Sequence, residues 1–346
     1  MRDPLEPKYI QDDDPLLWRF AMPLKGLYHP MGFPVEITTN SEDVLSAAEH
    51  HWGAFTKMFD ERPIELRIGV LETGGGLQLV EPVLRGHGDL MMKVGTMDDF
   101  AVCDMKKGVA FAWISAATAR NHAYVHTHYI EGTAFWALNT TYLTPVHAAC
   151  VSLNGKGLLF CGESEAGKSS LAYACVRSGW TFITDDLSEI VRSWETTSVL
   201  GNPHRFRLRE SAVTLFPELR DHPITLRANG ERAIELVTAR DPRFVTAPYS
   251  RVDYILFLNR QNAGRASLAP FSKQKAMRWF EQVLCVGDQT TRDSQAATLR
   301  RLLAAEILEF RYSDMDAAVE ELKLLVGAIE HPVRAKTFSV GYQENG

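Results

Sequence analysis

The sequence predicts an α/β domain that is preceded by a smaller α+β domain. Two observations lead to this prediction. Short strand patterns dominate the first part of the chain, whereas strands alternate with helices in the second part, as in layered α/β folds. The segment CGESEAGKSS, residues 161–170, also lies between an apolar strand and a helix. We therefore expect an accessory domain over residues 1–130 and a nucleotide-binding α/β domain over residues 131–346.

Composition limits the classes of protein that fit. The chain has 346 residues, is 45% hydrophobic and carries a formal net charge of −6, so we expect no nucleic-acid partner. Residues 1–15 are acidic and Pro-rich, unlike a secretory signal, and no stretch reaches the length of a membrane span. These features predict a cytoplasmic protein with no membrane contact. The cysteines lack a metal-ligand spacing and are expected as reduced core thiols: Cys103, Cys150, Cys161, Cys175 and Cys285.

In the first domain, apolar spacing predicts a helix over 41–59, which Asn40 or Ser41 would cap. Alternation predicts strands at 63–72, 100–105 and 108–114, with a turn at Gly74–Gly76. The even spacing in NHAYVHTHYI suggests one strand face for His122, His126 and His128. A metal site there lacks further ligands in the sequence, so we do not favour it.

A helix over 132–143 is expected to join the domains, and an Asn154–Gly155 turn predicts a hairpin over 147–161. The remaining predicted elements are a helix 169–178 ended by Gly179, a strand 181–184, a hairpin 224–237 turning at Asn229–Gly230, a central strand 252–259, and helices 295–307 and 315–329 around a strand 308–312. The aromatic residues of KAMRWFEQVL have helical spacing and are expected in the core.

The segment after the hairpin matches G-x-x-x-x-G-K-[ST], the pattern of a phosphate-binding loop (P-loop). Glycines let successive amides face phosphate oxygens, Lys168 would reach the β- and γ-phosphates, and the Ser169 hydroxyl would bind Mg²⁺. Carboxylates at Glu163 and Glu165 would repel phosphates unless they point outward. The predicted nucleotide-binding residues are Gly162, Glu163, Ser164, Glu165, Ala166, Gly167, Lys168, Ser169 and Ser170.

Two acidic residues end the predicted strand 181–184. Asp185 and Asp186 follow Lys168 by 17 and 18 residues, across one helix, so both would face the ligand crevice. One carboxylate can hold Mg²⁺, and the other can accept the proton of an attacking hydroxyl. His147 starts the hairpin and could point at this pair. Arg205, Arg207 and Arg209 alternate along an extended segment, where they would bind phosphate or an acidic acceptor, or form a solvated strand face.

Residues 147–191 resemble the kinase domain of the HPr kinase/phosphorylase family. The resemblance rests on a strand-initial His, a hairpin, G-[DE]-S-x-x-G-K-S, a helix that ends in R-x-G, and a strand that ends in Asp-Asp. It implies a fold related to phosphoenolpyruvate carboxykinase, use of ATP and Mg²⁺, and transfer to a serine of a small carrier protein. By this resemblance Asp186 would be the base and Asp185 the metal ligand. The matching positions are His147, Gly162, Glu163, Ser164, Gly167, Lys168, Ser169, Arg177, Gly179, Asp185 and Asp186.

Two departures point to a divergent relative: the family's downstream Gly/Arg signature is missing, and Glu165 stands where relatives often have Gly. The acceptor hydroxyl could therefore belong to a protein, a peptide or a small molecule, and a homo-oligomer is possible by the same resemblance. Two alternatives remain open, a small-metabolite kinase of the shikimate type and a non-catalytic nucleotide sensor. A switch GTPase is disfavoured because the sequence contains neither D-x-x-G nor N-K-x-D.

Overall fold

The computed structural model describes residues 20–72, 81–96, 98–282, 284 and 287–327. Four sequence predictions lie wholly or partly outside these ranges. They concern the N-terminal segment 1–15, the turn at Gly74–Gly76, the thiol of Cys285 and the end of the helix 315–329.

The first part of the chain forms a seven-stranded sheet in the order β1-β2-β3-β7-β6-β5-β4. Strand β3 pairs in parallel with β2 and β7, and the remaining pairs are antiparallel. In β3 the apolar side chains of Ile64, Leu66 and Ile68 alternate inward, as predicted. The strands are β1 (Leu24–Tyr28), β2 (Val35–Thr39), β3 (Ile64–Leu71), β4 (Val83–His87), β5 (Leu90–Val94), β6 (Phe100–Asp104) and β7 (Val109–Ser115).

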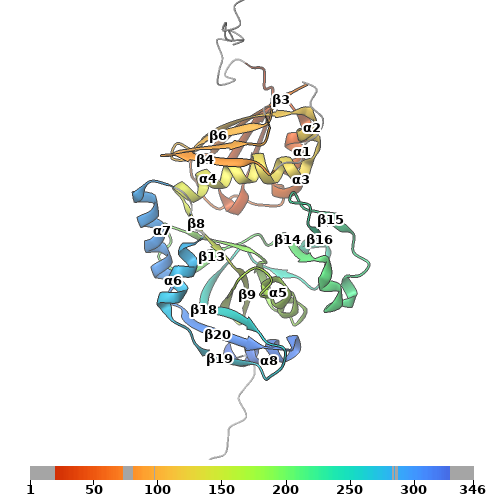
Figure 1. Cartoon of the computed structure of the whole chain (residues 1–346), viewed down its shortest axis with the longest axis vertical. Coiled ribbons are helices and arrows are strands. Elements are labelled where there is room, and N and C mark those ends of the chain that lie inside the picture. Colours follow the sequence, from red (N-terminus) through yellow and green to blue (C-terminus); the bar gives the residue numbers. More distant parts are fainter. Residues whose placement is uncertain (1–19, 73–80, 97, 283, 285–286, 328–346) are drawn as a thin grey trace, which may run out of the picture.

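Helices cover one face of this sheet (Figure 1). Val44, Ala47 and Trp52 of the first helix lie in one buried cluster with Leu66 of the sheet and Leu138 of the last helix. The helical segments are α1 (Glu42–Trp52), α2 (Ala116–Arg120), α3 (His122–Val125), a π-helical turn (His126–Glu131) and α4 (Gly132–Thr141). The helix predicted over 132–143 is therefore present as α4.

The first helix is shorter than predicted. It ends at Trp52 rather than continuing to residue 59, and the amides of Met58 and Phe59 donate to the carbonyl oxygen of Gly32 at 3.0 and 3.2 Å. The Phe59 ring stacks on Phe33, with ring centroids 4.0 Å apart. These contacts bind the segment after α1 to the β1–β2 connection instead of to another helical turn.

The strand predicted for NHAYVHTHYI is wrong, because the segment is helical. His126 is buried and its ring stacks on His51, with centroids 3.8 Å apart. His122 pairs with Asp43 at 3.0 Å, so His122 and His126 both contact α1, whereas the His128 ring lies against Tyr124. Within the described residues, no group of three or more His, Cys, Asp or Glu side chains could hold a metal ion.

The second part forms a ten-stranded sheet with the path β17-β11-β9-β10-β18-β13-β12-β8, beyond which β20 pairs with β18 and β19. The predicted central strand is β18, which pairs in parallel with both β10 and β20. The hairpin β9–β10 turns at Asn154 and Gly155, which both have positive φ, as predicted. The strands are β8 (Leu143–His147), β9 (Ala149–Leu153), β10 (Lys156–Cys161), β11 (Thr181–Thr184), β12 (Leu187–Val191), β13 (Ser198–Leu200), β17 (Val245–Thr246), β18 (Tyr249–Arg260), β19 (Ser267–Pro270) and β20 (Glu306–Tyr312).

Two buried clusters involve this sheet. Leu171 of α5 and Val319 of α8 belong to one, and Phe280 of α6 and Leu299 of α7 belong to the other. The core prediction for KAMRWFEQVL is confirmed for Phe280, which is fully buried, whereas Trp279 is partly buried and packs against the same cluster. The helices are α5 (Lys168–Arg177), α6 (Lys273–Glu281), α7 (Gln289–Leu302) and α8 (Met315–Leu325).

Helix α7 begins and ends earlier than the predicted 295–307. The Asp288 carboxylate accepts the Thr291 amide at 2.7 Å and caps its start. At its end, Glu306 and Ile307 join β20, because they pair with Tyr254 and Ile255 of β18. Pairing with the central strand outweighs the helical spacing of these two residues.

A three-stranded antiparallel sheet packs on the α5 side of the large sheet. Its strands are β14 (Arg205–Arg209), β16 (Arg232–Val237) and β15 (Ile224–Leu226), in that order. The β15–β16 hairpin turns around Gly230, which has φ +80°, so the predicted hairpin is present. The extended segment of alternating arginines is β14.

Polar contacts join the two parts of the chain. Arg192 donates to the carbonyl oxygen of Thr140 at 2.5 Å, and Gln295 donates to that of Asn139 at 2.9 Å. Helix α4 packs in the first cluster, which also receives Val191 and Leu200 of the large sheet. The domain boundary between residues 130 and 131 stays a prediction.

Among the described cysteines, Cys103, Cys150, Cys161 and Cys175 are buried free thiols, as predicted. Burial raises the pKa of Cys103 to about 12 and raises that of the other three as well. No helix in the described part of the chain combines the length and apolarity that a membrane crossing needs.

Candidate functional site

The glycine loop, residues 162–169, connects the end of β10 to the start of α5. Its backbone is left-handed at Glu165 (φ +69°) and at Gly167 (φ +94°). A Cβ atom on Gly167 would lie 2.9 Å from the Tyr312 hydroxyl, so both conformation and space require glycine there. The strand, the wrapped loop and the helix follow one another as the sequence predicts.

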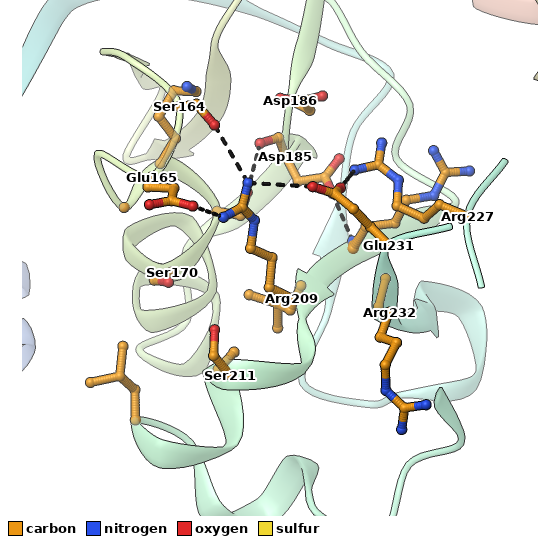
Figure 2. A pocket seen from close by; sticks show the side chains of 18 of the residues that line it. Ser164, Glu165, Ser170, Asp185, Asp186, Arg209, Ser211, Arg227, Glu231 and Arg232 are labelled. Carbon is orange, nitrogen blue, oxygen red and sulfur yellow. Dashed lines mark hydrogen bonds and ion pairs between the residues drawn. The ribbon is translucent and has the colours of Figure 1, made fainter. Parts of the chain in front are cut away.

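Glu165 occupies a conformation that costs a non-glycine residue about 1–2 kcal/mol. Its carboxylate pairs with the Arg209 guanidinium of β14, which also reaches the Ser164 hydroxyl at 3.4 Å. The predicted repulsion by Glu165 is therefore offset by an arginine (Figure 2).

Lys168 places its ammonium group within the loop. Its Nζ donates to the carbonyl oxygens of Gly162 at 2.7 Å and Glu163 at 3.1 Å. The side chain is buried, and desolvation lowers its pKa, against an opposing effect of the negative charge of Asp186. A cation held this way lies where an anion in the loop would contact it.

Ser169, in the first turn of α5, faces the end of β11. Its Oγ donates to the carbonyl oxygen of Asp185 at 3.3 Å. The Asp185 side chain accepts the main-chain amide of Arg207 at 2.7 Å through Oδ2. Burial, followed by the neighbouring charge of Asp186, raises the pKa of Asp185 to about 6. The first turn of the helix therefore contacts the main chain of Asp185, whose carboxylate is held by the Arg207 amide.

Asp186 is the more accessible member of the acidic pair, with 51% of its side chain exposed. Its Oδ1 lies 3.3 Å from Nδ1 of His147, the last residue of β8. Strand β12 starts at Leu187, which pairs with His147, so the strand register sets this contact. The expectation that His147 points at the acidic pair is confirmed.

The loop and the acidic pair line a single pocket of about 600 Å³. Nine of the residues predicted to bind nucleotide or metal or to act in catalysis line it: His147, Ser164, Glu165, Gly167, Lys168, Ser169, Ser170, Asp185 and Asp186. The residues that line the pocket do not include Gly162, Glu163 or Ala166. The carbonyl oxygens of Gly162 and Glu163 instead accept hydrogen bonds from Lys168.

Two of the three arginines of β14 share a partner. Arg205 is buried and pairs with Glu235 of β16, and it also donates to the carbonyl oxygen of His50 on α1. Arg207 donates to the same Glu235 at 2.9 Å and lines the pocket, as Arg209 does. Only two of the three predicted arginines therefore reach the site.

Sequence reasoning missed four charged residues of the pocket wall. Arg227, Glu231 and Arg232 come from the β15–β16 hairpin, and Arg260 comes from the end of β18. The hairpin itself was predicted, but its place beside the glycine loop depends on how the small sheet packs. The hydrophilic tip of the hairpin, RANGER at residues 227–232, contains no pattern that predicts its place beside the loop.

The donors near the loop fit a hard cation. Ser169 and Asp185 line the same pocket, and a hydroxyl and a carboxylate are oxygen ligands of the kind that Mg²⁺ prefers; the ion usually takes its other ligands from water and substrate phosphates.

No family model matches this chain, and no curated protein matches it. Among solved structures, the HPr(Ser) kinase/phosphatase from Coxiella burnetii is similar over 53% of this chain and 95% of that chain, at 12% identity. The TM-score is 0.28, so the likeness indicates only a distant structural relationship.

Proposed function

We propose that the protein is an ATP- and Mg²⁺-dependent kinase that transfers the γ-phosphoryl group to a hydroxyl of a protein, peptide or small molecule. One observation carries the proposal. The left-handed loop that opens α5, the Ser169–Asp185 contact and the exposed Asp186 line the same pocket. A phosphate-binding element and a carboxylate that can accept a proton are the two parts that phosphoryl transfer needs.

The loop side of the pocket binds the nucleotide in this proposal. Amides of the loop and of the first turn of α5 donate to phosphate oxygens, where the helix dipole favours negative charge. Lys168 exchanges its contacts with Gly162 and Glu163 for phosphate oxygens. Ser169 and Asp185 hold Mg²⁺, which when bound neutralises charge on the β- and γ-phosphates.

Asp186 acts as the general base. Its half-exposed carboxylate can meet an acceptor hydroxyl, whereas Asp185 is buried and engaged by the Arg207 amide. His147 orients Asp186 through the 3.3 Å contact, which leaves the second carboxylate oxygen for the acceptor. Removal of a general base typically costs about 10²–10⁴-fold in rate.

The test compares the wild type with Asp186→Asn. We expect the variant to bind ATP with Mg²⁺ in calorimetry about as tightly as the wild type, yet to lose about 10²–10⁴-fold in the rate of γ-phosphoryl transfer. Candidate acceptors are serine peptides and polar metabolites. Asp221→Asn is the matched control, because Asp221 is exposed and does not line the pocket.

Equal transfer rates in the wild type and Asp186→Asn would contradict the assignment of the base. A wild type that binds no ATP would contradict the proposal as a whole.

One observation favours a second candidate, a nucleotide sensor without catalysis. Arg207, whose amide holds Asp185, shares Glu235 with Arg205, and Arg205 donates to the His50 carbonyl oxygen in the first part of the chain. Nucleotide at Asp185 could thus alter the surface around α1. ATP binding without transfer to any hydroxyl acceptor would favour this candidate.

A further inference from the structure

The pocket wall formed by the three-stranded sheet and its hairpin carries arginines that take no part in the nucleotide contacts proposed above. Six Lys or Arg side chains line the pocket against four Asp or Glu side chains. Four of the six come from the three-stranded sheet and its hairpin: Arg207, Arg209, Arg227 and Arg232. A second anion, distinct from the nucleotide phosphates, therefore fits this wall.

These four arginines differ in how firmly they are held. Arg207 is paired with the largely buried Glu235, and Arg232 binds Glu210 through two contacts at 2.6 and 3.2 Å. Among the described residues, Arg227 forms one ion pair, with Glu231 at 3.3 Å, and both side chains are 43% exposed. Because an exposed pair of this kind contributes only about 0–1 kcal/mol, Arg227 can exchange its partner.

Glu231 shows where a carboxylate fits. Its Oε2 pairs with Arg227, and its Oε1 lies 3.7 Å from Nη2 of Arg209, so two arginines share one carboxylate (Figure 2). The hairpin backbone is fixed by hydrogen bonds from Arg227 N to Glu231 O and from Gly230 N to Arg227 O, both at 2.9 Å. The two long side chains can therefore move while the turn stays in place.

We propose that the acceptor carries a carboxylate near its hydroxyl, and that Arg227, assisted by Arg209, binds this carboxylate in the place that Glu231 occupies. The inference rests on the proposed kinase function, since it names the class of the acceptor. The hydroxyl then meets Asp186 in the same pocket. The carboxylate can belong to a small hydroxy acid or to an acidic residue beside a serine in a peptide.

The experiment uses matched pairs of acceptors that differ only in charge. Glycerate is compared with glyceramide, and a serine heptapeptide flanked by Glu is compared with one flanked by Gln. Binding is measured by calorimetry in the presence of Mg²⁺ and ADP, and transfer is measured with ATP. We expect the acidic member of at least one pair to bind about tenfold more tightly, as one charge-assisted hydrogen bond allows.

Variants assign the effect to the hairpin. Arg227→Gln should raise Kd and KM about tenfold for the acidic member only, and leave the neutral member and ATP unchanged. Glu231→Gln should lower Kd for the acidic member by removing the resident carboxylate. The control is Arg251→Gln, because Arg251 is exposed and pairs with Asp253. It lies near the start of β18, whereas the pocket residue Arg260 ends that strand.

The outcomes separate this inference from the proposed function. Phosphoryl transfer with equal Kd for acidic and neutral members overturns the inference and leaves the kinase. Selective, Arg227-dependent binding without any transfer supports the carboxylate site and contradicts the kinase. An equal loss of affinity for the acidic and the neutral member in Arg227→Gln also overturns the inference. Comparison of the peptide pair with the glycerate pair shows which source of the carboxylate the site binds.

Discussion

The pocket and the junction between the two large sheets are both rich in polar groups, but their environments differ. In the pocket, Asp186 and Arg227 have 51% and 43% of their side chains exposed. Among the described residues, each of them forms an ion pair with one partner. At the junction, Glu189 and Gln295 are fully buried, and His126 is 2% exposed. Water and ligands can replace partners in the first region and not in the second.

Burial keeps the junction groups neutral. Desolvation raises the pKa of Glu189 well above its ordinary value, against a smaller opposite effect from Asn139. Among the described residues, neither Glu189 oxygen nor Oδ1 of Asn139 has a hydrogen-bond partner of good geometry, so a protonated Glu189, which can donate, suits this pair. The buried polar groups of the junction therefore stabilise the fold, whereas the exposed polar groups of the pocket can exchange their partners for ligands.

The largest expected effect on stability comes from Glu189. Glu189→Ala removes the group that a protonated Glu189 would offer to Asn139 and leaves a cavity, so the free energy of unfolding should fall by about 2–4 kcal/mol. Glu189→Gln keeps shape and neutrality and should change it by less than about 1 kcal/mol. Urea unfolding measures both, and an equal loss in the two variants would show that Glu189 is charged.

The same residue predicts a dependence on pH. Because the folded-state pKa is raised, the folded protein keeps a proton that the unfolded chain releases above about pH 4.5. This contribution to stability is present at low pH and is lost as pH rises toward the folded pKa. The wild type should show it in unfolding at several pH values, and Glu189→Gln should not.

The stacked rings of His51 and His126 predict the opposite dependence of stability on pH. Burial lowers the pKa of His51 to about 2 and that of His126 to about 3, so only the unfolded chain binds their protons below pH 6.5. Stability should therefore fall with pH below 6.5, by up to about 3 kcal/mol at pH 5.5 for the two groups together. Unfolding of His51→Gln/His126→Gln should show a flatter slope, whereas His87→Gln, on the exposed strand β4, should keep the wild-type slope.

The smallest expected effect lies in the pocket, at the strained loop residue. Glu165→Gly relieves a left-handed conformation of about 1–2 kcal/mol and loses an exposed ion pair of about 0–1 kcal/mol, so thermal stability should rise slightly. Loss of the carboxylate should also tighten ATP binding in calorimetry. Glu163→Gly is the control and should not stabilise, since Glu163 has no positive φ. Lower stability of Glu165→Gly would show that the Arg209 pair holds the loop.

Much of the candidate site follows from local sequence. The glycine loop, the hairpin turn at Asn154 and the strand that ends before Asp185 each depend on residues within a few positions, and all three are present. The separation of Lys168 and Asp185 by one helix and one strand then brings Ser169 against Asp185. Local conformational preferences and element lengths fix such features.

The sequence predictions were wrong where contacts between residues far apart in the chain determine the secondary structure. The end of α1 depends on the Gly32 carbonyl, and the start of β20 depends on pairing with β18. The helical conformation of the segment around His126 places that ring against His51, a residue 75 positions earlier in the chain. No window of neighbouring residues contains these partners.

By itself, the sequence determined the glycine loop before α5, the acidic pair one helix later and the alternating elements that carry them. Only the tertiary structure decided that Arg227 and Glu231 face this loop, that Glu165 pairs with Arg209 and that Glu189 is buried. The physical reason is range. Backbone conformation is set by neighbouring residues, whereas burial and charge pairing depend on which surfaces meet after the chain has folded.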